Sequence, residues 1–243
     1  MSAPHSDHIL RVMPREMRLM SERILSMTGQ PKGFFLALQD LPMYSQKLGL
    51  GGFALLEKRF DELCGGRPES IAIVSEDAAK MRLDGRGQHA WFALPAVIDL
   101  LGELVSRFGE AEIVVADAVD LEEFKVAEAF AQRSGLSVVV TIGHEAVLRA
   151  SRRSLSGNVR QDDPLLWSLL EDGLAIPGEL WWRIYHQAKK ALAADSVVSR
   201  RHAGPMIVNQ DGTIIGRKDN DDETDVSFLM APGAETQTES TNP

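Results

Sequence analysis

The sequence predicts an α/β protein, with α+β as the alternative: a small sheet that contains a parallel βαβ unit and a β-meander, flanked by N- and C-terminal helices. Three observations favour this class. Residues 112–142 read as strand, helix, strand, the pattern of a crossover between parallel strands. Residues 70–94 hold short runs typical of strands, and apolar residues recur at helical spacing towards both ends of the chain.

Residues 1–13 predict a flexible lead-in, and residues 14–66 predict a helical cap. Pro14 is favourable in a first helical turn, and apolar residues recur every three or four positions from there to Gly29. A second helix follows, and a third is expected over residues 52–63.

Residues 67–155 predict the α/β core. In chain order, strands are expected over residues 70–75, 80–83, 88–94, 112–117 and 136–142. Asp84-Gly85-Arg86-Gly87 is typical of a tight turn between the second and third strands, and a helix begins near Pro95. A further helix begins near Asp120, so we expect the last two strands to be parallel neighbours; after Gly143 the chain reads as a helix.

Residues 156–230 predict helices plus a β-hairpin packed on the core. After a loop over residues 156–163, Pro164 opens one helix, and a longer helix runs over residues 178–193. The hairpin strands are expected over residues 205–208 and 213–216. Residues 231–243 are polar without periodicity, which predicts a disordered tail.

Composition excludes several classes of function. The net charge of −9 argues against nucleic acid as a partner, because binding phosphates requires an excess of Lys and Arg. Cys64 is the single cysteine, so neither an internal disulfide nor a cysteine-based zinc site can form. The sequence holds neither a long apolar run nor a secretory signal, so we expect a cytoplasmic protein without a membrane span. It also lacks a glycine-rich nucleotide motif, so no cofactor is expected.

Asp117 and His144 form the first candidate site. If the strands that precede them are parallel, both residues lie at the edge where α/β proteins bind ligands. A carboxylate and an imidazole there could share a proton or hold a polar ligand. The alternative is that Asp117 bonds the backbone of the next turn, and that His144 lies in the first turn of a surface helix.

The second candidate site precedes a Gly-Pro turn and suits an anionic ligand. Its polar and turn residues are Ser199, Arg200, Arg201, His202 and Gly204. Guanidinium groups bind carboxylates and phosphates in a bidentate manner, and His202 could protonate such a ligand. The alternative is that the arginines pair with the acidic run over residues 219–225.

The acidic run is the third candidate. Its alternating acids resemble a calcium loop, but Thr224 and Met230 stand where that loop needs Gly and Glu, so no metal site is expected, with a weak cation site as the alternative. Asp219 and Asp221 could instead complete the anion site as catalytic groups.

Trp181 and Trp182 are adjacent on a helix and point in different directions, so one of them could serve an interface. Cys64 lacks a neighbouring base and is expected to be a small buried residue.

Short motifs at both ends resemble a bacterial protein family of unknown function. They are a helix led by Glu16, then Gly29, Gly33, Leu48-Gly49, Leu55-Leu56 and Cys64, and later Ser199-Arg200, Ala203-Gly204 and Asp219-Asn220-Asp221. The last three elements run nearly continuously in the family, whereas residues 205–216 separate them here, and the resemblance covers about a third of the chain. It implies no activity, and it singles out residues 199–204 and 219–221 as candidates for a shared site.

Two functional hypotheses remain open. The first is an accessory or ligand-binding protein, such as a partner subunit of a metabolic enzyme, which would associate with another protein or with itself. The alternative is an enzyme that acts on an anionic carboxylate or phosphate metabolite through the 199–204 and 219–221 segments.

Overall fold

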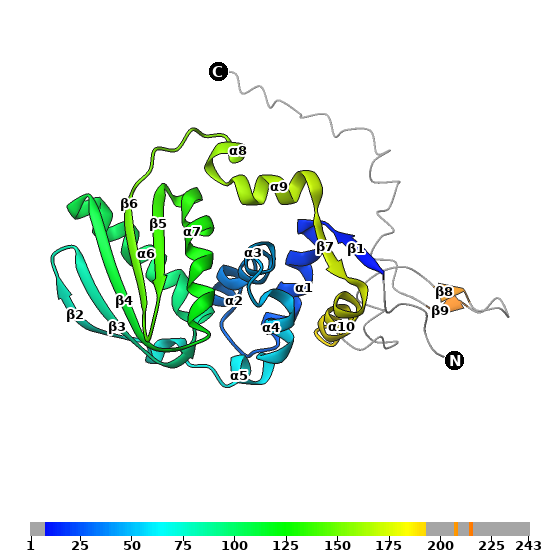
Figure 1. Cartoon of the computed structure of the whole chain (residues 1–243). Coiled ribbons are helices and arrows are strands. Elements are labelled where there is room, and N and C mark those ends of the chain that lie inside the picture. Colours follow the sequence, from blue (N-terminus) through cyan, green and yellow to red (C-terminus); the bar gives the residue numbers. More distant parts are fainter. Residues whose placement is uncertain (1–7, 193–206, 209–213, 216–243) are drawn as a thin grey trace, which may run out of the picture. The chain divides into compact units, whose positions relative to one another are not determined.

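The computed structural model describes residues 8–192, 207–208 and 214–215 (Figure 1). The chain divides into two compact units, Met1–Leu192 and Ala193–Pro243. In the second unit, β8 (Ile207–Val208) and β9 (Ile214–Ile215) pair antiparallel, as the predicted hairpin requires. The rest of that unit, including residues 199–204, 219–225 and 231–243, lies outside the described residues.

The first unit is built on a five-stranded mixed sheet, which confirms the predicted α/β class. The strand order is β2-β3-β4-β6-β5, and β3 and β4 are parallel neighbours joined through helix α6. These elements span β2 (Ala72–Asp77), β3 (Lys80–His89), α6 (Ala90–Phe108), β4 (Glu110–Val119), β5 (Leu136–Ile142) and β6 (Ala146–Arg152). The parallel βαβ unit is therefore β3–α6–β4.

The predicted pairing within residues 112–142 is wrong. Strands β4 and β5 run in the same direction, but β6 lies between them and is antiparallel to both. The helix expected after Gly143 is this strand, because Ala146, Leu148 and Ala150 are buried alternately with more exposed neighbours, which is the period of a strand. The link from β4 to β5 consists of short helical segments: η2 (Leu121–Lys125), α7 (Val126–Phe130) and η3 (Ala131–Ser134).

The predicted tight turn at residues 84–87 is also wrong, because β3 continues through it. Asp84 Oδ1 accepts a hydrogen bond from the backbone N–H of Arg86 at 2.9 Å, so the glycines serve an irregularity inside one strand. Residues 90–94, expected as strand, begin α6 instead. His89 caps this helix, since its Nδ1 accepts a hydrogen bond from the N–H of Trp91 at 3.1 Å. The prediction failed because a short apolar run is compatible with either a strand or a buried helix.

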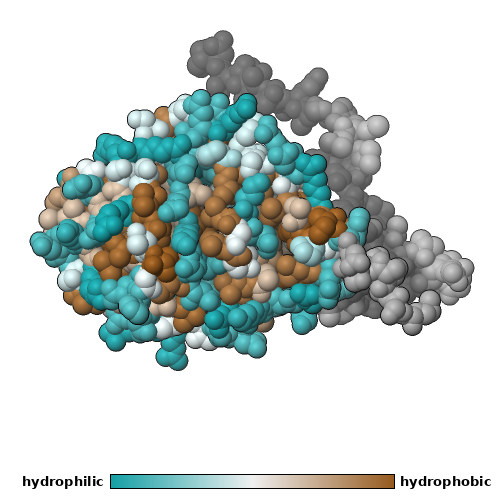
Figure 2. Space-filling model, in the orientation of Figure 1, coloured by the Kyte–Doolittle hydropathy of each residue, from teal (hydrophilic) through white to brown (hydrophobic). Residues whose placement is uncertain are grey.

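The sheet buries one face and exposes the other. Helices α6 and α7 pack on the buried face, and Figure 1 shows α7 between the sheet and the N-terminal helices. Alternate residues of β3 to β6, including Ile113 and Leu148, form this core with apolar residues of α6. On the opposite face, apolar residues are interleaved with polar ones, as in the mixed surface of Figure 2.

The N-terminal helices form the predicted cap, in five pieces rather than three. They are α1 (Pro14–Ser26), α2 (Lys32–Leu38), α3 (Leu41–Lys47), α4 (Gly52–Lys58) and α5 (Phe60–Cys64). Met17 and Ile24 of α1 and Phe53 and Leu56 of α4 are fully buried in the same core as the sheet. The cap and the sheet therefore share one hydrophobic core.

The lead-in predicted for residues 1–13 is wrong for its last part. Strand β1 (Ile9–Val12) pairs antiparallel with β7 (Leu174–Pro177), and Val12 and Ile176 are buried. The pairing partner lies about 160 residues away, so local sequence carries no sign of it.

Three helices follow the sheet: α8 (Val159–Asp162), α9 (Pro164–Asp172) and α10 (Gly178–Lys189). The last two confirm the expected helices, whereas α8 is a short turn of helix inside the expected loop. Among the described residues, we find no helix with the length and apolarity needed to cross a membrane.

Candidate ligand-binding site

The carboxyl edge of the parallel pair β3–β4 has a distorted backbone. Of the four non-glycine residues with positive φ in the described part of the chain, three lie here: Arg86 (52°), Asp117 (48°) and Asp120 (56°). Gly85 approaches this turn so closely that a Cβ on it would lie 2.7 Å from the carbonyl oxygen of Asp117. Strained backbone of this kind clusters at functional sites, which makes this edge a candidate site.

Asp117 and His144 lie at this same edge, although strands β4 and β5 are not neighbours. Val115 pairs with Ala146, and extending that register by two residues puts Asp117 opposite His144. Both side chains are exposed, and no hydrogen bond or ion pair joins them among the described residues. His144 lies in the turn between β5 and β6, not in a surface helix. The two residues share an edge without forming a closed site.

A buried histidine, which sequence reasoning passed over, lies beside them. The side chain of His89 is 4% exposed, and its Nε2 atom lies 3.3 Å from Oδ2 of Asp120 without forming a hydrogen bond. Because Nδ1 accepts from Trp91, the proton of the neutral ring is on Nε2. Burial is the main cause that lowers the pKa of His89 to about 4; the Asp120 carboxylate opposes this shift, and the charge of Arg59 adds to it.

Arg59 binds the Asp120 carboxylate that lies beside His89. Its Nε donates to Asp120 Oδ2 at 2.8 Å and its Nη2 to Oδ1 at 3.2 Å, while Nη1 binds both carboxylate oxygens of Glu62. These hydrogen bonds raise the pKa of Arg59, so it stays charged. A guanidinium held on two carboxylates in this way has little capacity left for an incoming anion.

Glu123 accepts hydrogen bonds from both the cap and α6 near the same edge. It is buried, and its two oxygens accept from the backbone N–H of Gly51 at 2.8 Å and from Trp91 Nε1 at 2.9 Å. Together with Arg59 it links the cap to the sheet edge and to α6. The edge where many α/β proteins bind a ligand is thus occupied by the chain's own side chains.

An apolar pocket of about 500 Å³ lies elsewhere, between α2, the short helix η1 (Pro68–Ser70), β2 and α6. This volume is within the range of small-molecule sites. Ten of its twelve lining residues are apolar. The lining consists of Gln30, Pro31, Phe34, Pro68, Glu69, Ile71, Ala72, Ile73, Leu83, Phe92, Ala96 and Leu100.

The wall of this pocket is held in place by aromatic packing. Phe34 and Phe92 meet edge to face, with ring centroids 5.5 Å apart. Phe92 also presses against Gly66, where an added Cβ would lie 2.0 Å from the ring, so no larger residue fits there without moving it. Gln30 Nε2 donates to the carbonyl of Gly66 at 2.9 Å, leaving its amide oxygen and the Glu69 carboxylate as polar groups for a ligand.

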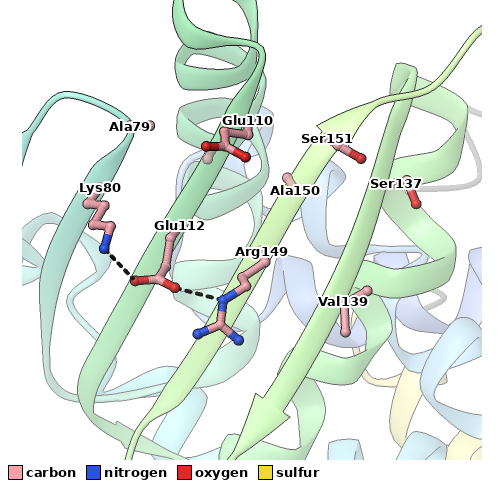
Figure 3. Close-up of a pocket in the computed structure, with 10 residues that line it drawn as sticks. Ala79, Lys80, Glu110, Glu112, Ser137, Val139, Arg149, Ala150 and Ser151 are labelled. Atoms are coloured by element: carbon pink, nitrogen blue, oxygen red, sulfur yellow. Dashed lines mark hydrogen bonds and ion pairs between the residues drawn. The ribbon is translucent and has the colours of Figure 1, made fainter.

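A second pocket, of about 360 Å³, lies on the exposed face of the sheet (Figure 3). Glu112 lies at its centre, 2.7 Å from Arg149 Nε and 4.0 Å from Lys80 Nζ. The Lys80 and Arg149 side chains are strongly exposed, and exposed ion pairs contribute little to stability or affinity. This smaller pocket, whose charged residues already pair with one another, is the weaker candidate of the two.

Of the remaining candidate site residues, the structure describes only Cys64. Ser199, Arg200, Arg201, His202, Gly204, Asp219 and Asp221 lie outside the described residues. Cys64 is exposed rather than buried, and partial burial with the charge of Asp61 raises its pKa, which disfavours the reactive thiolate. In the described ranges, no three His, Cys, Asp or Glu side chains gather closely enough to hold a metal ion.

The adjacent tryptophans separate as expected. Trp181 is 8% exposed and packs edge to face on Phe53, with ring centroids 5.7 Å apart. Trp182 is 42% exposed and meets Tyr185 at 5.6 Å. A role for Trp182 at an interface stays a prediction.

Comparison with known proteins gives a fold but no family. No family model matches the chain, and no curated protein sequence does. A dehydrogenase from Sinorhizobium meliloti is similar in structure, with a TM-score of 0.51 and 10% identity, covering 74% of this chain and 100% of that one. Malate dehydrogenase from Pyrococcus horikoshii OT3 gives a TM-score of 0.45 and 12% identity, covering 78% of this chain and 68% of that one.

Malate dehydrogenase from Entamoeba histolytica gives a TM-score of 0.40 and 14% identity over 54% of this chain. The present chain spans only 38% of that protein's length. At these identities the likeness shows an α/β fold and nothing about activity.

Proposed function

We propose that this chain is a binding protein that responds to a small molecule with an aromatic or branched apolar body. The observation that carries the proposal is the pocket of about 500 Å³ between α2, η1, β2 and α6, with apolar residues on ten of twelve lining positions. Burying an apolar ligand there removes its surface from water, which is the main source of affinity in such sites.

The polar groups of this pocket indicate which head group the ligand carries. Glu69 is the single ionisable residue among the lining residues, and the amide oxygen of Gln30 is an acceptor. Both groups accept hydrogen bonds, so a ligand with an amine or another donor fits better than one with a carboxylate.

A binding role fits the carboxyl edge of the sheet as well. There Arg59, His89, Asp120 and Glu123 are engaged with one another or with the chain's own backbone and Trp91. These groups support a packed link between cap and sheet, and we assign them no catalytic role. The enzyme hypothesis rests on the separate segments 199–204 and 219–221.

The test is a titration of the full chain with phenethylamine and, in parallel, with phenylacetate. A fragment of this size should bind weakly, with a Kd on the order of millimolar. We expect phenethylamine to bind more tightly than phenylacetate, and Glu69→Gln to remove the difference.

Matched variants on one helix locate the site. Ala96 lines the pocket, and Ala96→Leu should fill it and weaken phenethylamine binding by roughly tenfold. Ser106 is exposed on the same helix and does not line the pocket, so Ser106→Leu should leave binding unchanged. Equal affinity in wild type and Ala96→Leu would exclude this pocket as the binding site.

A further inference from the structure

The two edges of the five-stranded sheet are protected very differently. At one edge, the backbone N–H of Val140 in β5 donates to Glu128 Oε1 at 2.8 Å, and α7 lies against the strand. At the other edge is β2, whose single neighbour in the sheet is β3. Within residues 8–192, no side chain accepts a hydrogen bond from the N–H groups of Ala72–Asp77. An edge strand left in this state is a template for pairing with another strand.

Exposed apolar side chains on β2 favour pairing with another strand. Ile73 is 55% exposed and Val74 is 58% exposed, although both are large apolar residues. Val74 falls at an irregularity of the pairing between β2 and β3, where it has no partner residue on β3. The strand Ala-Ile-Val-Ser-Glu-Asp holds no Lys or Pro, so its protection against edge-to-edge pairing is limited to its short length, the irregularity at Val74 and the two acids at its end.

The charge distribution along β2 selects the geometry of pairing. Its first half, Ala72–Val74, is apolar, and its acids, Glu76 and Asp77, lie at the other end. A parallel pair of two such strands would put the acids of both copies side by side, which is unfavourable. An antiparallel pair about a two-fold axis puts the acids of each copy opposite the uncharged half of the other.

We propose that β2 pairs antiparallel with β2 of a second copy of this chain, joining the two sheets into one across a two-fold axis. This surface is self-complementary, as an isologous dimer requires. The pairing satisfies backbone groups along β2 and covers Ile73 and Val74. It goes beyond the proposed binding function: Ala72 and Ile73 of β2 also line the pocket, whereas Val74, near the centre of the paired strands, does not.

The size of β2 sets the strength of the association. The strand has six residues, so the pair is smaller than a standard interface of about 800 Å² per partner. The dimer should therefore be reversible, with the average mass rising over the micromolar to hundreds-of-micromolar range of protein concentration.

Sedimentation velocity of the full chain tests the proposal, with two Val→Lys variants as a matched pair. Val74→Lys puts a charge on the open edge and should leave the protein monomeric at every concentration. Val139→Lys is the control, because Val139 is similarly exposed, at 61%, but lies on β5, the edge strand that α7 packs against. This variant should dimerise as wild type does. A monomeric wild type, or a dimer that Val74→Lys leaves intact, would overturn the proposal.

Hydrogen exchange of the wild type gives a second readout that needs no variant. The amides of β2 that point away from β3 should exchange more slowly at high protein concentration than at low, while those of β5 do not change. Exchange of the β2 amides that is independent of concentration would also overturn it. Ala96→Leu should dimerise normally, so failure of pocket binding and failure of dimerisation are distinguishable.

Discussion

Nε2 of His89 lies 3.3 Å from Oδ2 of Asp120, in a position where the histidine side chain is almost fully shielded from water. Despite that carboxylate, burial holds the pKa of His89 at about 4. The ring also caps α6 through Nδ1, and it can do so only while Nδ1 carries no proton. Protonation of His89 is therefore coupled to the stability of the link between sheet, α6 and cap.

The first prediction concerns stability against pH. Unfolded His89 titrates near 6.5 and folded His89 near 4, so between these values the unfolded state binds a proton that the folded state does not. The stabilising effect of neutral His89 is complete above pH 6.5 and is lost as the pH falls towards 4, by on the order of 3 kcal/mol. Urea unfolding at several pH values measures this.

His89→Asn keeps a capping acceptor but does not titrate, so its stability should depend less on pH over this range. His144→Asn, at an exposed histidine, is the control and should follow wild type. Parallel curves for wild type and His89→Asn would contradict the prediction.

The neighbours of His89 should move its pKa in opposite directions. The charge of Asp120 raises that pKa and the charge of Arg59 lowers it, so Asp120→Asn should lower it further and Arg59→Met should raise it. Asn tolerates the left-handed backbone conformation of residue 120, so Asp120→Asn removes the charge without adding backbone strain. Histidine NMR titrations, with His89→Asn for assignment, give both values. Shifts of the same sign in the two variants would show that the assigned charges are not the cause.

Glu123 should contribute to stability through its two acceptor oxygens. Glu123→Gln replaces one oxygen by an NH2 group that faces a donor, either Gly51 N–H or Trp91 Nε1–H. We expect a loss of about 1–3 kcal/mol in the free energy of unfolding. The neighbouring exposed Glu122 provides the control, since Glu122→Gln should change stability by less than about 0.5 kcal/mol. Equal effects of the two substitutions would contradict the role of Glu123.

The arginine-rich segment yields a prediction that stands on the sequence alone. If Ser199–Gly204 binds anions, inorganic phosphate should raise the melting temperature of wild type, and Arg200→Ala/Arg201→Ala should abolish the rise. If residues 219–221 belong to the same site, Asp219→Asn/Asp221→Asn should change the phosphate effect too. A phosphate effect equal in wild type and the arginine double variant would remove the anion-site hypothesis.

Local signals in the sequence were sufficient for much of the fold. The periodicity of α1 and α10, the Asp163-Pro164 start of α9 and the apolar run of β4 each depend on neighbouring residues, and each was predicted. Asp163 caps α9 by accepting from the N–H of Leu166 at 3.0 Å, as an N-terminal cap should.

The errors arose where distant residues decide the outcome. β1 is a strand because β7 pairs with it, and β6 is inserted between β4 and β5 by sheet pairing that no local pattern specifies. His89 could have been noticed as a capping residue two positions before Trp91, since a polar residue before an apolar run marks a helix start. Its burial against Asp120 depends on tertiary packing. The apolar pocket brings together α2, β2 and α6, so its lining was not predictable from spacing.

Methyl-resolved NMR of the full chain during a phenethylamine titration tests the binding function most directly. The account predicts that the methyl signals of Ile71, Ile73, Leu83 and Leu100 shift together and saturate with one Kd, because these residues line the same pocket. It also predicts that the exposed Val159 and Leu170, on α8 and α9, do not shift. Unchanged pocket signals at saturating phenethylamine, or shifts confined to residues outside the pocket, would contradict it.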